Sequence, residues 1–347
     1  MKELKNDKFR DYYIKNKCRE LLEVDIDKKD ITFIDEGVMN FVYKVITPKG
    51  NFYFKQALKK AKHHERIGKD LSSISYLRIN YEKNVIDKIQ GLFKNKIKLP
   101  NIIYYDDKNN IIILTDVAGG KSKILQNVLL LGDFNNKTAL NIGKFLGILH
   151  RHTYNKRNVI RGSPEEDMKN WKVFLKMRTK GIISERIKKP VVYELYNLFN
   201  VGLKKHTYDI LIHMDCCPKN IFQRSDNSIG IIDFELASGM GDPAYDIGFA
   251  LGHYFLFAIL KEIPESSLSA IQLMIDSYIE EINHLKFNNT YFLCRMVKYA
   301  GAVLLYRIAG SSPALYIPKE KFSDLIRYGS QLVISDCSKT KDIFSIF

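Results

Sequence analysis

The sequence predicts an α+β protein with two lobes, a small β-rich N-terminal lobe and a larger, mainly helical C-terminal lobe. Three observations lead to this prediction. The 347 residues are enough for two domains of about 100–200 residues each. Short β-type runs bounded by turn residues dominate the first third of the chain, whereas the remainder spaces its apolar residues as helices do. Since no internal repeat or low-complexity linker separates the two parts, we expect one functional unit.

The N-terminal lobe is expected to form a small sheet with one helix laid on it. Turn residues at 35–37 and 48–51 separate its first strands, a spacing typical of hairpins. The expected elements, in chain order, are a helix (3–23), three strands (31–34, 41–46 and 52–54), a helix (71–89) and two further strands (102–105 and 111–114).

The C-terminal lobe is predicted to begin after Gly119-Gly120, where the composition becomes helical. Helices are expected at 140–151, 165–178, 190–205, 244–260, 266–284 and 290–309. Within this half, only the region from Leu211 to Ile232 has a strand–loop–strand pattern. We therefore place the N-terminal lobe at residues 1–115, a hinge at 116–120 and the C-terminal lobe at 121–347.

The net charge of +15 is the unusual feature of the composition. A field of that sign favours anionic partners such as ATP, sugar phosphates, RNA or an acidic membrane surface. Basic residues that merely decorate a solvated surface explain the charge equally well. Because no zinc-finger, helix-turn-helix or RNA-binding signature accompanies the charge, nucleic acid is disfavoured as a partner.

Cysteine usage and the lack of long apolar runs favour a cytoplasmic protein. The five cysteines form no CxxC pair, and their odd number argues against a disulfide framework. The first residues mix charges and lack the apolar core of a signal peptide. The nearest candidate for a membrane span, Ile247–Leu260, is shorter than the roughly 18 residues required and contains Gly252 and His253. We expect it to be a buried helix, with no membrane partner and a monomeric or homodimeric state.

One segment of the C-terminal half carries most of the chemistry. Asp215 follows an apolar pair and His213, so it lies where a strand gives way to a loop, and Asn220 comes five residues later. Asp233 and Glu235 follow the next apolar run. A kinase needs such a set. We expect Asp215 to accept the proton of an attacking hydroxyl, and the other three to hold magnesium against nucleotide phosphates.

The spacing of these residues supports the assignment. In a strand, positions two apart lie on one face, so we expect Asp233 and Glu235 to face the same cleft as Asp215. Taken singly, Asp215 or Asn220 would more commonly cap a turn. Taken together, in this order, the set favours the catalytic interpretation.

The N-terminal lobe supplies candidate nucleotide contacts. Lys55 ends an apolar strand, from which a lysine can pair with nucleotide phosphates, and Glu82 is the nearest helical acidic residue that could orient it. The turn that contains Gly37 and Asn40 could cover the phosphates with backbone N–H groups. It has a single glycine and does not match G-x-G-x-x-G, so a plain hairpin turn is the alternative.

Asp246 has two interpretations. It precedes an apolar run, so it could cap the N-terminus of a helix. Alternatively, it could be a buried aspartate that holds the catalytic loop through hydrogen bonds. Neither interpretation makes it catalytic.

The motif His213-x-Asp215-x-x-x-x-Asn220, followed by Ile232-Asp233-Phe234-Glu235, resembles that of the aminoglycoside phosphotransferase, choline kinase and methylthioribose kinase superfamily. The resemblance covers about residues 30 to 320. It implies a bilobal protein-kinase-like fold and an enzyme that phosphorylates hydroxyls of small molecules with ATP, or another NTP, and Mg²⁺. Glu235, two residues after Asp233, resembles the metal motif of methylthioribose kinase more than that of protein kinases.

The resemblance also implies roles for individual residues. Asp215 would be the base, the phosphates would lie on Lys55, and the magnesium ligands would be Asn220, Asp233 and Glu235. The adenine would be held by backbone groups of Asp116, Val117 and Ala118. A structural role is expected for His150, in a helix whose Leu-x-x-Leu-His pattern is similar to one of the superfamily.

The acceptor does not follow from the resemblance, because Met214 and the segment Cys216–Lys219 depart from the methylthioribose kinase pattern. Arg307 could receive an anionic or hydroxylated substrate, or simply cap a helix C-terminus. The only dense acidic run in this half, Glu165–Asp167, could equally be the first turn of a helix. The basic composition favours a sugar, nucleoside or methylthioribose-like acceptor over a polycationic aminoglycoside. An antibiotic phosphotransferase is one alternative, and a catalytically weak nucleotide-binding pseudokinase is another.

Overall fold

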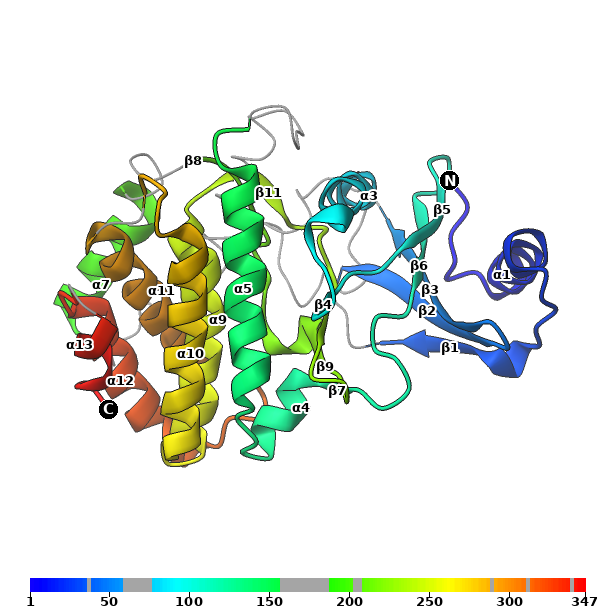
Figure 1. Cartoon of the computed structure of the whole chain (residues 1–347). Coiled ribbons are helices and arrows are strands. Elements are labelled where there is room, and N and C mark those ends of the chain that lie inside the picture. The colour runs from blue at the N-terminus through cyan, green and yellow to red at the C-terminus, as the bar shows by residue number, and fades with distance from the viewer. Residues whose placement is uncertain are drawn as a thin grey trace.

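The computed structural model describes residues 1–35, 39–58, 77–156, 187–201, 208–287, 290–309, 313–337 and 340–347. It has the two lobes that the sequence predicts, a strand-rich N-terminal lobe and a C-terminal lobe of long helices (Figure 1). The predicted α+β fold class is therefore confirmed. The residue boundaries proposed for the lobes and the hinge stay a prediction.

The N-terminal lobe is a five-stranded antiparallel sheet in the order β1-β2-β3-β6-β5, flanked by two helices. Its elements are α1 (Asp7–Leu22), β1 (Ile31–Ile34), β2 (Asn40–Thr47), β3 (Gly50–Ala57), α3 (Arg78–Ile89), β5 (Ile102–Asp106) and β6 (Ile111–Thr115). All five predicted strands are present. The predicted helix at 71–89 is confirmed where it is described, from residue 78 onward, whereas residues 71–76 lie outside the described residues.

The alternation of side chains along β3 decides what each face of the sheet contacts. Phe52 and Phe54 pack with Ile111 and Ile113 of β6 against helix α1. The intervening positions of both strands face the opposite way and join the larger core, which continues through α3 into the C-terminal lobe. Lys55 lies on this second face, so strand geometry directs its amine toward α3 and the C-terminal lobe.

The C-terminal lobe packs long helices against several short strands. Its helices are α4 (Leu125–Leu130), α5 (Asn136–Thr153), α7 (Lys189–Tyr196), α9 (Pro243–Leu260), α10 (Glu265–Ile282), α11 (Thr290–Ala309), α12 (Phe322–Ile334) and α13 (Thr340–Phe344). The short strands are β4 (Ile97–Lys98), β7 (Lys123–Ile124), β8 (Tyr208–Ile212), β9 (Ile221–Gln223), β10 (Ile229–Ile231) and β11 (Ser238–Gly241). They form one sheet in the order β4-β10-β9-β7 and a separate pair of β11 with β8.

The C-terminal predictions need two corrections. The sequence predicted strands only between 211 and 232, but β7 and β11 lie outside that range, and β4 crosses from the predicted N-terminal lobe to pair with β10. Two to four residues are too few for a periodic pattern. The helix predicted at 190–205 is α7, which continues into a π-helical turn at Asn197–Val201. Residues 202–205 and the helix predicted at 165–178 lie outside the described residues.

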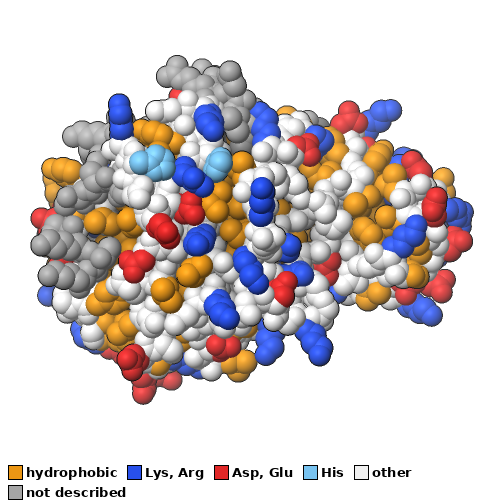
Figure 2. Space-filling model, in the orientation of Figure 1, with side chains coloured by type: hydrophobic (Ala, Val, Ile, Leu, Met, Phe, Trp, Pro, Cys, Tyr) orange, Lys and Arg blue, Asp and Glu red, His pale blue; other side chains and the backbone are white. Residues whose placement is uncertain are grey.

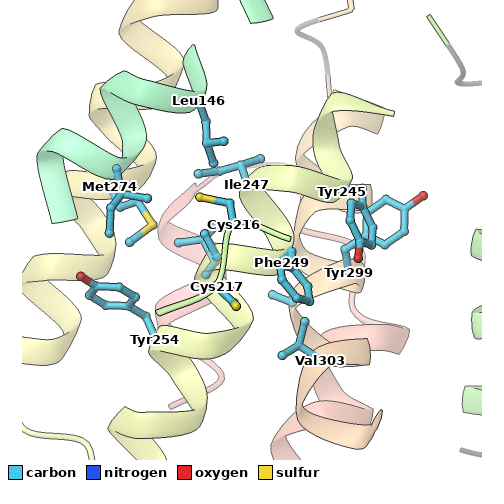
Figure 3. Close-up of a cluster of buried hydrophobic side chains, with 14 of the residues drawn as sticks. Leu146, Cys216, Cys217, Tyr245, Ile247, Phe249, Tyr254, Met274, Tyr299 and Val303 are labelled. Atoms are coloured by element: carbon cyan, nitrogen blue, oxygen red, sulfur yellow. The ribbon is translucent and has the colours of Figure 1, made fainter. Parts of the chain in front are cut away.

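Helix α9 is the central helix of the C-terminal lobe. It is apolar around its circumference, and α10 and α11 pack against it. Within the described parts of the chain it is the one helix long and apolar enough to cross a membrane, but 94% of that apolar stretch is buried inside the protein. The prediction of a buried core helix is confirmed. Figure 3 shows part of this core, where Ile247 and Phe249 of α9 lie near Cys216 and Cys217.

Two glycines allow helices to approach closely in this lobe. A Cβ at Gly143 of α5 would come 2.2 Å from the backbone oxygen of Met274 in α10. A Cβ at Gly248 of α9 would come 2.5 Å from the backbone oxygen of Met296 in α11. Because backbone atoms cannot rotate out of the way, a larger residue at either position would force the helices apart.

We expect Gly143→Ala to lower the free energy of unfolding by roughly 1–3 kcal/mol, the usual cost of overpacking a core. The matched control is Gly91→Ala, because a Cβ at Gly91 would meet no atom within 4 Å. Urea denaturation of the two variants and the wild type measures the difference. Equal stability of the two variants would contradict the close approach of α5 to α10.

Candidate active site

A buried lysine lies between three carboxylates from distant parts of the chain. The Nζ of Lys55 is 2.6 Å from Oδ1 of Asp233, 2.8 Å from Oε2 of Glu82 and 3.5 Å from Oε2 of Glu235. Lys55 comes from β3 and Glu82 from α3, whereas the other two follow β10 in the C-terminal lobe. The structure therefore brings together four residues that the sequence predicted for the phosphate and metal site.

The turn after β10 places Asp233 and Glu235 by a route that the sequence did not predict. Strand β10 ends at Ile231, so the two residues do not share a strand, and the predicted parity argument is wrong. Asp233 instead has a φ of 72°, in the left-handed region that non-glycine residues rarely adopt. This bend turns the chain so that both carboxylates still reach Lys55.

The cluster carries more negative than positive charge near Lys55. Burial opposes the charge on Lys55, but Asp233, Glu235 and Glu82 outweigh it and raise the pKa of the lysine well above its ordinary value. Burial, together with Asp233 and Glu235, raises the pKa of Glu82 to about 7 against the opposing effect of Lys55. Burial is thus the main reason that Glu82 holds its proton, with the two neighbouring carboxylates adding to it.

The donor set fits a magnesium ion. One oxygen of each of Glu82, Asp233 and Glu235 lies within 4.8 Å of the others. Carboxylate oxygens are ligands that Mg²⁺ prefers, usually one or two of them together with phosphate oxygens. Since Glu82 also accepts a hydrogen bond from the backbone amide of Phe234, Asp233 and Glu235 are the carboxylates best placed to hold the ion.

The loop from His213 to Asn220 holds the candidate base. Asp215 is buried, and the side-chain amide of Asn220 donates to its backbone oxygen (2.9 Å) and to its Oδ2 (3.0 Å). Bonding through the amide nitrogen leaves the oxygen of Asn220 as the atom that would meet a metal. A short 3₁₀ turn at Pro218–Asn220, with proline at its start, brings Asn220 back toward Asp215. The predicted pairing of Asp215 and Asn220 within one turn is present.

Buried contacts fix the start of this loop. Asp246 accepts hydrogen bonds from the backbone amides of His213 (2.6 Å) and Met214 (2.8 Å) and lies 3.2 Å from Nε2 of His150. Met214 has a φ of 67°, a backbone conformation that needs such support. Of the two interpretations of Asp246, the structure thus shows the buried aspartate that holds the loop of the candidate base through hydrogen bonds. His150 is fully buried and also contacts the hydroxyl of Tyr278, so it has the structural role expected of it.

Asp242, rather than Asp246, caps helix α9. Its side chain accepts from the backbone amide of Ala244 and pairs with the guanidinium of Arg295 at 2.7 and 3.1 Å. This pair was not predicted from the sequence. An aspartate followed by proline is a recognisable helix start, but nothing in the sequence indicates that Arg295 of α11 lies against it.

A cavity of about 600 Å³ lies at the predicted hinge. It is bounded by the start of β3, by Phe222 of β9 and by the segment that includes Asp116 and Ala118. Hinge backbone groups already have partners. The amide of Asp116 donates to Asn51, the amide of Ala118 to Asp116, and the carbonyl of Val117 accepts from a guanidinium. A base that binds either amide must therefore displace its bond, whereas the carbonyl of Val117 can accept a second one.

Three predicted site residues remain, Asn40, Gly37 and Arg307. Asn40 is buried and donates to Glu235, whereas Gly37 lies outside the described residues. Arg307 lies in the last turn of α11 with its guanidinium 5.9 Å from the ring centres of Tyr306 and Tyr316. Both interpretations of Arg307 therefore stay open. The acidic run at residues 165–167 lies outside the described residues.

Lys219 adds a cation that the sequence analysis did not assign. Its Nζ is 4.0 Å from Oδ2 of Asp215, and its side chain is 56% exposed. Asp215 raises the pKa of Lys219 above its ordinary value, with Cys217 and Asp233 adding to the effect, whereas Arg307 lowers it. The candidate base therefore has one cation beside it. The spacing of four residues between Asp215 and Lys219 was the signal in the sequence that could have indicated this pair.

The raised pKa of Glu82 predicts a pH dependence of stability in the metal-free protein. The folded state holds this proton up to a pH of about 7, whereas the ordinary value is 4.5, so stability is lost as the pH rises through that window. Glu82→Gln removes the group that titrates. We expect the unfolding free energy of the wild type, relative to this variant, to fall between those pH values and then to level off. Urea denaturation across the range measures it, and a constant or rising difference would refute the assignment.

Comparisons with known proteins agree with this site. Residues 139–263, from α5 to α9, match the phosphotransferase enzyme family (APH). A search of curated proteins gives no match. Among solved structures, the chain is similar to the amicoumacin kinase hAmiN in complex with AMP-PNP, Ca²⁺ and Ami, with a TM-score of 0.54, 14% identity and full coverage of both chains.

Two further structures have the same fold. The choline kinase LicA from Streptococcus pneumoniae has a TM-score of 0.50 and 14% identity, and the macrolide 2'-phosphotransferase MphH from Brachybacterium faecium has a TM-score of 0.51 and 12% identity. Each match covers 93% of this chain and 98% of the other. These structures share the fold of this chain, and the family match covers the segment that contains Asp215, Asn220, Asp233 and Glu235.

Proposed function

We propose that this protein transfers the γ-phosphoryl group of ATP, or of another NTP, to a hydroxyl of a small molecule in a Mg²⁺-dependent reaction. The observation that carries the proposal is the contact of Lys55 with Glu82, Asp233 and Glu235, close to a loop that holds Asp215. Asp215 and Asp233 both raise the pKa of Lys219, which supports one site for the base and the phosphate end.

Each residue has a distinct part in the proposed reaction. The nucleotide phosphates pair with Lys55, which Glu82 orients. The Mg²⁺ would be held by Asp233, Glu235 and Asn220, and when bound it supplies charge neutralisation at the phosphates. Asp215 accepts the proton of the acceptor hydroxyl as its oxygen bonds to the γ-phosphorus. The bond from that phosphorus to the β–γ bridging oxygen breaks, which gives ADP and a phosphate ester.

The cavity at the hinge is the proposed site of the nucleotide base. It lies beside the strand that carries Lys55, and its lining includes Asp116 and Ala118, two of the residues predicted to hold the adenine. Val117 packs its side chain toward Gly230 instead, so only its backbone is a candidate contact. A base in this cavity would leave its phosphates to extend along β3 toward Lys55.

A sugar, a nucleoside or a methylthioribose-like compound is the proposed acceptor class. The cation beside the base, Lys219, supports this choice over a polycationic aminoglycoside, which it would repel. The presence of Lys55, Asp215, Asn220 and Asp233 in one arrangement supports an active kinase rather than a pseudokinase.

The +15 charge does not require a polyanionic partner. On the face shown in Figure 2, lysine and arginine side chains are spread over both lobes and interspersed with acidic ones. A dispersed charge of this kind supports a small-molecule substrate over nucleic acid. The five free cysteines, all buried, fit the proposed cytoplasmic location.

The direct test is a panel of sugars, nucleosides, amino alcohols and aminoglycosides incubated with ATP and Mg²⁺, with mass spectrometry as the readout. The proposal predicts that one class gains the mass of a single phosphate, and that the gain requires Mg²⁺. Phosphorylation of aminoglycosides alone would overturn the acceptor class. Mg²⁺-independent transfer would overturn the proposed metal site.

Asp215→Ala is expected to retain nucleotide binding and to reduce kcat by roughly 10²–10⁴-fold, the usual contribution of a general base. The matched control is Asp276→Ala, which removes an exposed carboxylate of α10 and should leave turnover unchanged. Steady-state kinetics and nucleotide titration check both variants. If Asp215→Ala kept turnover within a few-fold of the wild type, the base would be another group.

A further inference from the structure

Arg78 is a buried arginine in the site that the proposed reaction does not use. It is the first residue of α3, and only 4% of it is exposed. Its Nη2 donates to Oδ1 of Asn40 (2.8 Å) and to the backbone oxygen of Met39 (2.9 Å). Its Nε lies 3.2 Å from the same Oδ1 and 3.3 Å from Oε2 of Glu235. One guanidinium thus contacts the start of β2 and a candidate metal ligand at once.

Asn40, Arg78 and Glu235 each contact the other two. It accepts from Arg78 through its side-chain oxygen and donates to Oε2 of Glu235 through its side-chain nitrogen. That carboxylate oxygen also lies 3.5 Å from the Nζ of Lys55. With three donors around Oε2, the second oxygen of Glu235 is the one left to meet a cation.

The charges give Arg78 a second effect. Without it, Lys55 alone would face the carboxylates of Glu82, Asp233 and Glu235. An arginine is always protonated, and a buried positive charge beside these carboxylates weakens their attraction for a bare divalent cation. The same side chain holds Asn40, where the segment expected to cover the phosphates enters β2.

We propose that Arg78 is a positioning residue that couples metal binding to nucleotide binding. It lowers the affinity of the carboxylates for a metal ion alone, and it holds Asn40 against Glu235 so that a metal and nucleotide phosphates are bound together. This inference rests on the proposed function of the site. A residue that only pinned α3 to β2 would not affect the two affinities in opposite directions.

Calorimetric titration of two probes tests the inference. The first is Mn²⁺ alone, and the second is AMP-PNP with saturating Mg²⁺. For Arg78→Gln we expect Mn²⁺ to bind at least about fivefold more tightly, because one positive charge is lost, and the nucleotide at least about fivefold more weakly, because Asn40 loses its tether. Arg78→Lys keeps the charge but loses the several N–H donors of the guanidinium that hold Asn40. The affinity for Mn²⁺ should therefore stay unchanged while the affinity for the nucleotide falls.

The matched control is Lys83→Gln, which removes the same charge from the same helix at an exposed pair with Asp87. It should leave both affinities within twofold of the wild type. Changes in the same direction for both probes in Arg78→Gln, or no change in either, would overturn the coupling.

A second variant keeps the test decisive if Arg78→Gln does not fold. Asn40→Ala removes the side chain that links Arg78 to Glu235 and leaves the charge of Arg78 in place. The nucleotide should therefore bind more weakly, and the affinity for Mn²⁺ should be unchanged. Unchanged nucleotide affinity would overturn the inference. A wild type that binds no nucleotide in the presence of Mg²⁺ would instead overturn the proposed function itself.

Discussion

The interaction of Lys55 with three carboxylates is the constraint on which the arrangement of the two lobes depends. Lysine and carboxylate charges are costly to bury and are tolerated only when they are paired. Lys55 belongs to the sheet, Glu82 to α3, and Asp233 and Glu235 to the C-terminal lobe. Removing Lys55 would leave the three carboxylates without the cation that they share. The cluster therefore ties strand, helix and catalytic loop together where the nucleotide phosphates are proposed to bind.

A second set of contacts makes the catalytic loop rigid. Asp246 accepts hydrogen bonds from the backbone amides of His213 and Met214. Directly after Asp215, Cys216 and Cys217 are buried in the core beneath the loop (Figure 3). Catalytic groups work best when buried side chains lock their positions. The departure of Cys216 and Cys217 from the methylthioribose kinase pattern is explained by packing in this core, and neither thiol needs a role in the chemistry.

Much of the fold and part of the site could be predicted from the sequence, because they depend on local signals. Strand alternation and helical spacing predicted the N-terminal sheet and the long helices. The order of Lys55, Asp215 and Asn220 along the chain predicted the residues that the structure places in the site. In these cases, the spacing along one segment determines which way a side chain points.

The remaining features depend on contacts that no local pattern contains. The left-handed conformation of Asp233 replaces the predicted strand, and aspartate at that position carries no signal for it. Arg78 and Arg295 act through partners far away in the sequence, and among 54 lysines and arginines a single one does not stand out. Their importance follows only from burial beside carboxylates.

The central claim is that the carboxylates around Lys55 form the phosphate and metal end of a nucleotide site. The most direct measurement is a crystal structure with AMP-PNP and Mn²⁺, in which anomalous scattering locates the metal. The account predicts a metal peak within coordination distance of Asp233, Glu235 and Asn220, with the phosphates beside Lys55 and the base in the hinge cavity. A metal elsewhere, or phosphates that do not contact Lys55, would contradict it.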